Sequence, residues 1–118
     1  MGAPGQKKKA LLPAAKAFDL EKLVEYGEGA VVSRTLVQND AGTITLFAFD
    51  KGEALSEHTA PFDAVVHLLD GEGEIVIGGR RHRVCRGEFI VMPAGVPHAV
   101  KAMKRFKMLL TMLRAGKR

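Results

Sequence analysis

Cysteine is almost absent from this chain of 118 residues, in which Cys85 is the only one. A single thiol cannot form a disulfide within the chain, and a lone cysteine suits a reducing compartment. Long hydrophobic runs are missing as well, because no stretch of eighteen apolar residues occurs. The sequence therefore predicts a cytoplasmic protein without a membrane-spanning helix.

Low-complexity tracts are also absent, and the composition is that of a globular protein, with 47% hydrophobic and 26% charged residues. The length favours one domain and is too short for two ordinary ones. A domain of this size buries roughly two thirds of the surface that its unfolded chain exposes. It therefore needs neither a metal ion nor a disulfide in order to fold.

Acidic residues are missing from both ends of the chain. Residues 1–18 carry four lysines and residues 101–118 carry seven basic residues, whereas residues 19–100 hold all thirteen acidic residues and seven basic ones, a formal charge of −6. Basic ends can attract nucleic acid or an anionic membrane surface. No helix carries a basic stripe, however, and aromatic residues are not interleaved with the charges. We therefore expect solvated tails and rank a nucleic-acid partner last.

Short β-type runs separated by turn residues dominate the sequence. Residues 1–17 are typical of a flexible basic arm, and residues 18–26 form the one helical candidate, with Asp19 as its N-cap. The expected strands cover residues 30–38, 43–49, 64–69, 74–77, 80–84, 88–92 and 105–113. Gly78 and Gly79, between two of these strands, indicate a two-residue hairpin. The pattern predicts an all-β sandwich or barrel that forms a single domain over residues 18–118.

Two segments share a regular spacing of glycine, proline and histidine. In the first, gaps of five, one, three and six residues separate Gly52, His58, Ala60, Ala64 and Gly71. In the second, gaps of five, one, two and three residues separate Gly87, Pro93, Gly95, His98 and Ala102. With these segments the chain resembles the cupin superfamily, whose motifs run G-x5-H-x-H-x3-4-E-x6-G and G-x5-P-x-G-x2-H-x3-N. It looks like a small, single-domain, conserved-barrel cupin.

The resemblance implies a double-stranded β-helix, or jelly-roll barrel, commonly a homodimer, with a ligand pocket in the barrel mouth. Metal-binding cupins hold one ion with three histidines and a glutamate. Carried over position by position, His58 and His98 match two of those histidines. Ala60 stands in place of the third histidine, Ala64 in place of the glutamate, and Ala102 in place of the asparagine. We therefore expect a pocket that is larger and less polar than a complete metal site.

A divalent metal ion (Zn, Ni, Fe or Mn) would need more than two imidazoles. Catalytic zinc usually has three protein ligands, and non-haem iron has two histidines and a carboxylate. His67 is the obvious further candidate, but it lies three residues beyond Ala64 and points away from the pocket in a regular strand, as Asp63 also does. Metal binding by His58 and His98, with His67 as a less favoured third ligand, stays an open alternative.

Three hypotheses about function follow. The favoured one is a cupin that binds a small molecule with one polar or anionic group against His58 and His98, which could also serve as an acid–base pair. The second is a metal-dependent enzyme of the dioxygenase, isomerase or decarboxylase type that uses the same histidines and a further ligand. A nucleic-acid-associated protein that uses its basic ends comes third. Methionines 92, 103, 108 and 112 could line an apolar pocket, although filling of the core is their usual role.

Overall fold

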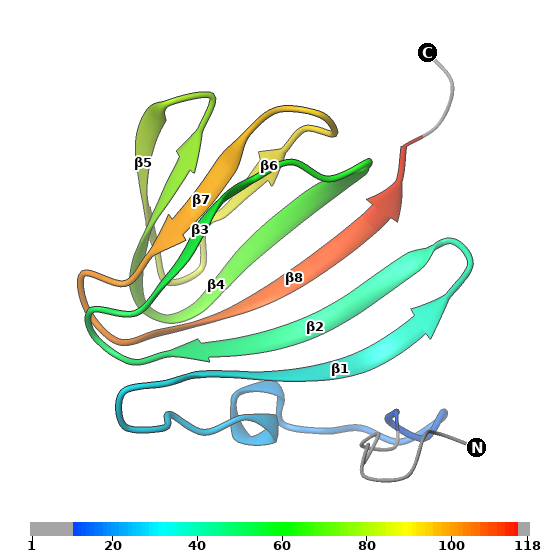
Figure 1. Cartoon of the computed structure of the whole chain (residues 1–118). Coiled ribbons are helices and arrows are strands. Elements are labelled where there is room, and N and C mark those ends of the chain that lie inside the picture. Colours follow the sequence, from blue (N-terminus) through cyan, green and yellow to red (C-terminus); the bar gives the residue numbers. More distant parts are fainter. Residues whose placement is uncertain (1–10, 116–118) are drawn as a thin grey trace, which may run out of the picture.

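The structure, a computed structural model, describes residues 11–115 and is built almost entirely of antiparallel strands (Figure 1). The strands are β1 (Val31–Asn39), β2 (Gly42–Phe49), β3 (Ala54–His58), β4 (Phe62–Ile77), β5 (Arg80–Cys85), β6 (Phe89–Met92), β7 (His98–Lys101) and β8 (Phe106–Arg114). One 3-10 turn, η1 (Leu20–Leu23), precedes them. The prediction of an all-β jelly-roll barrel is therefore confirmed.

Two curved sheets share the long strand β4. Its first half lies between β8 and β6, and from β8 the sheet continues to β2 and β1. Its second half lies between β5 and β7, and β7 pairs in turn with β3. Because one strand belongs to both sheets, the sheets curl around a common interior, as Figure 1 shows.

The sequence 70–73 does not form the turn that was expected between strands 64–69 and 74–77. The chain continues through it as a single strand of 16 residues, with a bulge between Leu68 and Asp70. Gly71 has a φ of 74° at this point, and a Cβ there would overlap with the carbonyl oxygen of Arg105. The turn-type residues therefore bend the strand from one sheet into the other instead of ending it.

The helix expected over residues 18–26 is confined to the single turn η1. Asp19 makes no side-chain capping bond, and Val24 is already extended, with φ −141° and ψ 142°. The expected hairpin is confirmed, because Gly78 and Gly79 both have positive φ and Ile77 pairs with Arg80. Within the described range, no helix is long and apolar enough to cross a bilayer.

The N-terminal segment (residues 11–26) lies against the outer face of the β1–β2 part of the sheet. Apolar side chains of the segment and the sheet form a separate small core, made of Val24, Leu36, Leu46 and Ala48 with Leu12, Leu20, Leu23, Tyr26, Val32, Ile44, Leu69 and Leu109. The Leu12 N–H also donates to the Leu36 carbonyl. The arm expected over residues 1–17 lies partly outside the described residues, and its described part follows the sheet.

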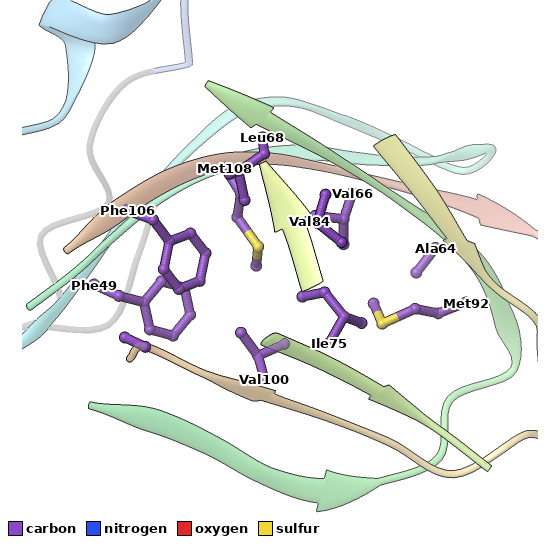
Figure 2. Packing of buried hydrophobic residues seen from close by; sticks show 11 residues of the cluster. Phe49, Ala64, Val66, Leu68, Ile75, Val84, Met92, Val100, Phe106 and Met108 are labelled. Atoms are coloured by element: carbon purple, nitrogen blue, oxygen red, sulfur yellow. The ribbon is translucent and has the colours of Figure 1, made fainter. Parts of the chain in front are cut away.

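The main core fills the barrel between the two sheets (Figure 2). Phe49 and Phe106 are fully buried at one end, with ring centroids 4.5 Å apart and planes inclined by only 8°. Gly73 lies beside them, and a Cβ there would approach the Phe106 ring to 2.9 Å. Toward the other end, Figure 2 shows Ala64 and Met92 in place of the aromatic rings. The barrel is thus closed by stacked rings at one end and has an alanine and flexible methionine side chains at the other.

Candidate functional site

Strands β3 and β7 carry the two histidines of the sequence motifs. His58 is the last residue of β3 and His98 is the first of β7, and the antiparallel register places them opposite each other. Neither strand was among those expected from the sequence. β3 contains no β-branched or aromatic residue and β7 has only four residues, so neither has the composition that identifies a strand.

The two imidazoles meet at the barrel mouth although forty residues separate them in the chain. Their Nε2 atoms are 3.1 Å apart, and the rings cross at 71° with centroids 4.4 Å apart. His98 is buried, with 4% of its surface exposed, whereas His58 lies at the rim and is exposed. The pair therefore connects the barrel interior with solvent.

Backbone carbonyls fix the hydrogen on each ring. His58 Nδ1 lies 2.8 Å from the Ser56 carbonyl oxygen, and His98 Nδ1 lies 3.2 Å from that of Val96. A carbonyl oxygen can only accept, so each Nδ1 carries a hydrogen and donates it. In the neutral rings both Nε2 atoms then present lone pairs, and these lone pairs face each other. A proton, a cation or a hydrogen-bond donor of a ligand can bind to these two lone pairs.

The environment of His98 favours its neutral form. Burial lowers the pKa of His98 below the usual value, and the Val96 carbonyl partly opposes this change. The neighbouring imidazole of His58 lowers the pKa of His98 further. Near neutral pH, His98 therefore offers a lone pair rather than a positive charge.

A small cavity extends inward from the histidine pair. It measures about 50 Å³ and is lined by Leu55, His58, Ala60, Ala64, Met92, His98, Val100, Met108, Leu110 and Met112. Ala60 and Ala64, which occupy two of the motif's ligand positions, thus face the same space as the histidines. The cavity is apolar apart from the two imidazoles, but it is not the large one that was expected. Long methionine and leucine side chains occupy the room that the two alanines leave.

The loop before His98 is braced against the start of β4. Gly95 has a φ of 77°, and its N–H donates to the Ala60 carbonyl over 2.9 Å. The Ala94 N–H donates to the Asp63 carboxylate over 3.0 Å. Asp63, which strand alternation placed outside the pocket, therefore helps to hold the turn that positions His98.

The ligand set of metal-binding cupins does not fit these residues. Ala60 and Ala64 have no lone pair to offer. His67 is exposed on the outer face of the sheet, opposite Phe89 and Leu109, as strand alternation predicted. Across residues 11–115, no three His, Cys, Asp or Glu side chains gather closely enough to hold a metal ion.

Comparisons with known proteins agree with this architecture. The family model described as Cupin domain matches residues 45–112. A conserved protein of unknown function from Streptococcus pyogenes is 39% identical, with a TM-score of 0.84, over 96% of this chain and 99% of that one. A cupin superfamily protein from Desulfitobacterium hafniense is 32% identical, with a TM-score of 0.82, over 90% and 97%. An uncharacterized Aquifex aeolicus protein is 27% identical over 94 residues, 78% of each chain.

Proposed function

The chain belongs to the cupin domain family, and from this premise we propose that its barrel cavity binds a small molecule through His58 and His98. The observation that carries the proposal is the pair of Nε2 atoms, 3.1 Å apart, at the mouth of an apolar cavity. Ligand pockets of this kind combine apolar walls with a few converging polar groups that orient the ligand.

The protonation state of the pair selects the kind of ligand. Both Nδ1 hydrogens are used by carbonyls, so the pair accepts hydrogen bonds and does not donate them. A ligand with an O–H, N–H or cationic group is therefore favoured over the anionic ligand that the sequence also allowed. An anionic group of a ligand would face two lone pairs at this position and would be repelled by them.

The cavity volume limits the size of the buried part of the ligand. At about 50 Å³ the cavity is far smaller than the roughly 300–1,000 Å³ of pockets for drug-sized molecules. It accommodates a group of a few non-hydrogen atoms. The ligand is thus either a very small alcohol or amine, or a larger molecule that inserts only one end.

Thermal-shift and calorimetric titrations with small alcohols, amines and carboxylates test this function. A ligand at 100 times its Kd should raise the stability by about 2.7 kcal/mol. The increase should vanish in His58→Ala and persist in the matched control His67→Ala, because His67 lies on the opposite face. Carboxylates that bind better than alcohols and amines, or equal binding by His58→Ala, would contradict the proposal.

A metal-dependent enzyme is the second candidate, and one distance favours it. The two Nε2 atoms are 3.1 Å apart. Two nitrogens that bind the same ion, each at about 2.0–2.1 Å, can lie at this distance from each other. His58 and His98 would be the ligands, and an ion there would act as a Lewis acid. This candidate ranks below the first because no carboxylate or third imidazole joins the pair within the described part of the chain. Metal analysis of protein purified without an affinity column tests it, and His67→Ala again serves as the control.

We also infer that the bare part of the outer sheet face binds a second copy of this chain. Phe89, Val91, Leu113 and Val37 on this face are 67%, 46%, 49% and 44% exposed. Strand pairing aligns Val91, Val65 and Thr111 on this face, and the row continues through Ile44, at the border of the small core, to Val37. A two-fold axis would place the same row on both partners.

Light scattering coupled to gel filtration tests this homodimer. Phe89→Glu should shift the protein to the mass of a monomer, because it introduces a charge at the most exposed apolar position of the face. Met103→Glu is the matched control, since Met103 is 62% exposed in the loop between β7 and β8. A monomeric wild type, or an equal effect of the two substitutions, would show that this face has no such partner.

A further inference from the structure

Methionine side chains surround the position of the missing glutamate. In the strand register Ala64 pairs with Met92 of β6 on one side and with Met112 of β8 on the other. Residues that lie directly opposite each other on neighbouring strands share a face, so both methionines point into the barrel with Ala64. Both also line the cavity that contains the histidine pair, as does Met108. Two thioethers thus flank the position where metal-binding cupins have a carboxylate.

The donor atoms of this cavity are all neutral and mostly soft. Two imidazole nitrogens and the methionine sulfurs carry no charge, and the carboxylate that would offset a divalent ion is replaced by the methyl group of Ala64. The cost of moving an ion from water into an apolar space grows with the square of its charge, so it is about fourfold larger for a divalent ion. Thioether ligands select Cu(I), and imidazole also suits copper.

We propose that the cavity is a Cu(I) site, in which Nε2 of His58 and of His98 and the sulfur of Met92 or Met112 bind the ion. The proposal goes beyond the small-molecule function proposed above, although it uses the same cavity and the same pair of lone-pair donors. It names a soft monovalent cation as the ligand. The substitutions at positions 60 and 64 then change which ion the barrel prefers instead of removing the site.

Anaerobic titration of the full chain with Cu(I), in competition with a chromogenic Cu(I) chelator, measures the affinity directly. We expect one ion per chain. The double variant Met92→Leu, Met112→Leu should bind Cu(I) on the order of 100-fold more weakly. Leucine has a volume close to that of methionine, so the fold is retained. Met103→Leu is the matched control, because it removes an exposed thioether outside the cavity and should leave the affinity unchanged.

X-ray absorption of the copper-loaded protein gives an independent readout, and sulfur next to the metal in the wild type should disappear in the double variant. Unchanged Cu(I) affinity in the double variant, together with its loss in His58→Ala, would overturn the assignment of methionine ligands but leave the histidine pair as the binding site. Tighter binding of Zn(II) than of Cu(I) by the wild type would overturn the choice of ion. Cu(I) binding that is indifferent to His58→Ala would overturn the proposal, and the small-molecule titrations above decide separately whether the proposed function also fails.

Discussion

The two ends of the barrel are built for different purposes. At the closed end, Phe49 and Phe106 are stacked and fully buried, and Gly73 leaves only enough room for the Phe106 ring. At the mouth, alanines line a cavity and the lone pairs of His58 and His98 face each other. One end therefore supplies packing, and the other leaves space and polar atoms that a ligand can use.

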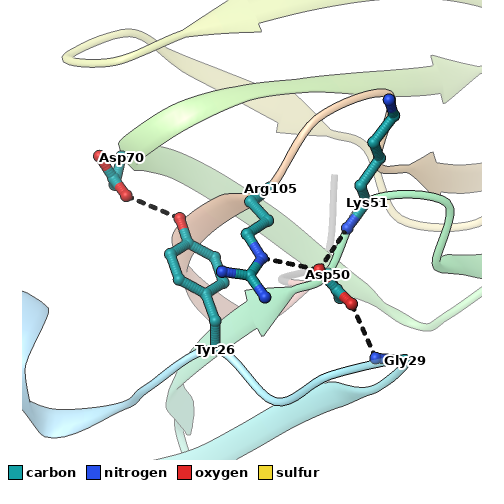
Figure 3. Close-up of polar contacts among 6 residues, drawn as sticks. All are labelled: Tyr26, Gly29, Asp50, Lys51, Asp70 and Arg105. Carbon is teal, nitrogen blue, oxygen red and sulfur yellow. Dashed lines mark hydrogen bonds and ion pairs between the residues drawn. The ribbon is translucent and has the colours of Figure 1, made fainter.

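The polar groups outside the closed end show the same contrast. Asp50 accepts hydrogen bonds from the Gly29 N–H and from Arg105, and the Arg105 guanidinium lies over the ring of Tyr26 (Figure 3). The Tyr26 hydroxyl donates to Asp70. Burial raises the pKa of Tyr26 above its usual value, and the Asp70 carboxylate adds to this increase. In this cluster each donor is paired with an acceptor, and these bonds attach the N-terminal segment to the barrel. In the histidine pair, by contrast, two lone pairs face each other without a donor between them.

Side-chain truncations at the two ends of the barrel should differ most in their effect on the free energy of unfolding. Phe106→Ala removes a stacked ring from a fully packed region and should lower the free energy of unfolding by about 3–5 kcal/mol. His58→Ala at the exposed rim should change it by less than about 0.5 kcal/mol. Urea unfolding monitored by circular dichroism measures both. Similar losses for the two variants would mean that the ends do not differ as described.

Two glycines with positive φ sharpen the comparison. Gly71→Ala, at the bend of β4, adds a Cβ that overlaps with the Arg105 carbonyl, so backbone must shift. Gly95→Ala, beside the mouth, meets nothing within 4 Å and should cost only the strain of positive φ, about 1–2 kcal/mol. Denaturant midpoints should place Gly71→Ala well below Gly95→Ala. The reverse order would show that the turn before His98 is the more tightly packed of the two.

The stability of the protein should depend on pH through Asp50. Hydrogen bonds from Arg105, Gly29 and Lys51 lower the pKa of Asp50 from 3.8 to about 2. Because the folded pKa lies below the unfolded one, the stabilisation is complete above about pH 4 and is lost as the pH falls toward 2. Asp50→Asn should therefore be less stable than wild type at neutral pH, and the difference should shrink over this interval.

Urea midpoints between pH 7 and pH 2 test this dependence. Arg105→Met removes the strongest of the three partners and should reduce the same acid-dependent loss without changing the carboxylate. A constant difference between wild type and Asp50→Asn at every pH would contradict the role of the carboxylate charge.

Much of the barrel follows from local sequence signals. Alternating runs and glycine turns predict β1, β2, β5, β6 and β8, and the resemblance carried by the two spaced motifs implies the jelly roll. These local signals fail where tertiary packing determines the backbone conformation. The residues around Gly71 have the composition of a turn. The Arg105 backbone packs against Gly71, however, and the positive φ of Gly71 bends the strand there instead of ending it. β3 and β7 are strands because β3 pairs with β7 and β7 pairs also with β4, although their own residues only weakly favour strands.

The candidate site divides in the same way. The resemblance to cupins implied that His58 and His98 would meet, and strand alternation predicted that His67 would point outward. Neither could predict that methionine side chains would flank Ala64. Met92 and Met112 come to flank Ala64 only because each pairs with it, from opposite sides, across long separations in the chain. The cavity volume depends in turn on how those side chains pack.

Membership of β4 in both sheets also restricts how a guest can reach the interior. The sheets cannot part along this strand, because it is a continuous backbone with hydrogen-bonded neighbours on both sides. β3, by contrast, pairs only with β7 among the described strands, and its register slips between Leu55 and His58. The border of the barrel that carries His58 is therefore held by strand hydrogen bonds on one side only, so a guest that enters there meets its first anchoring group on arrival.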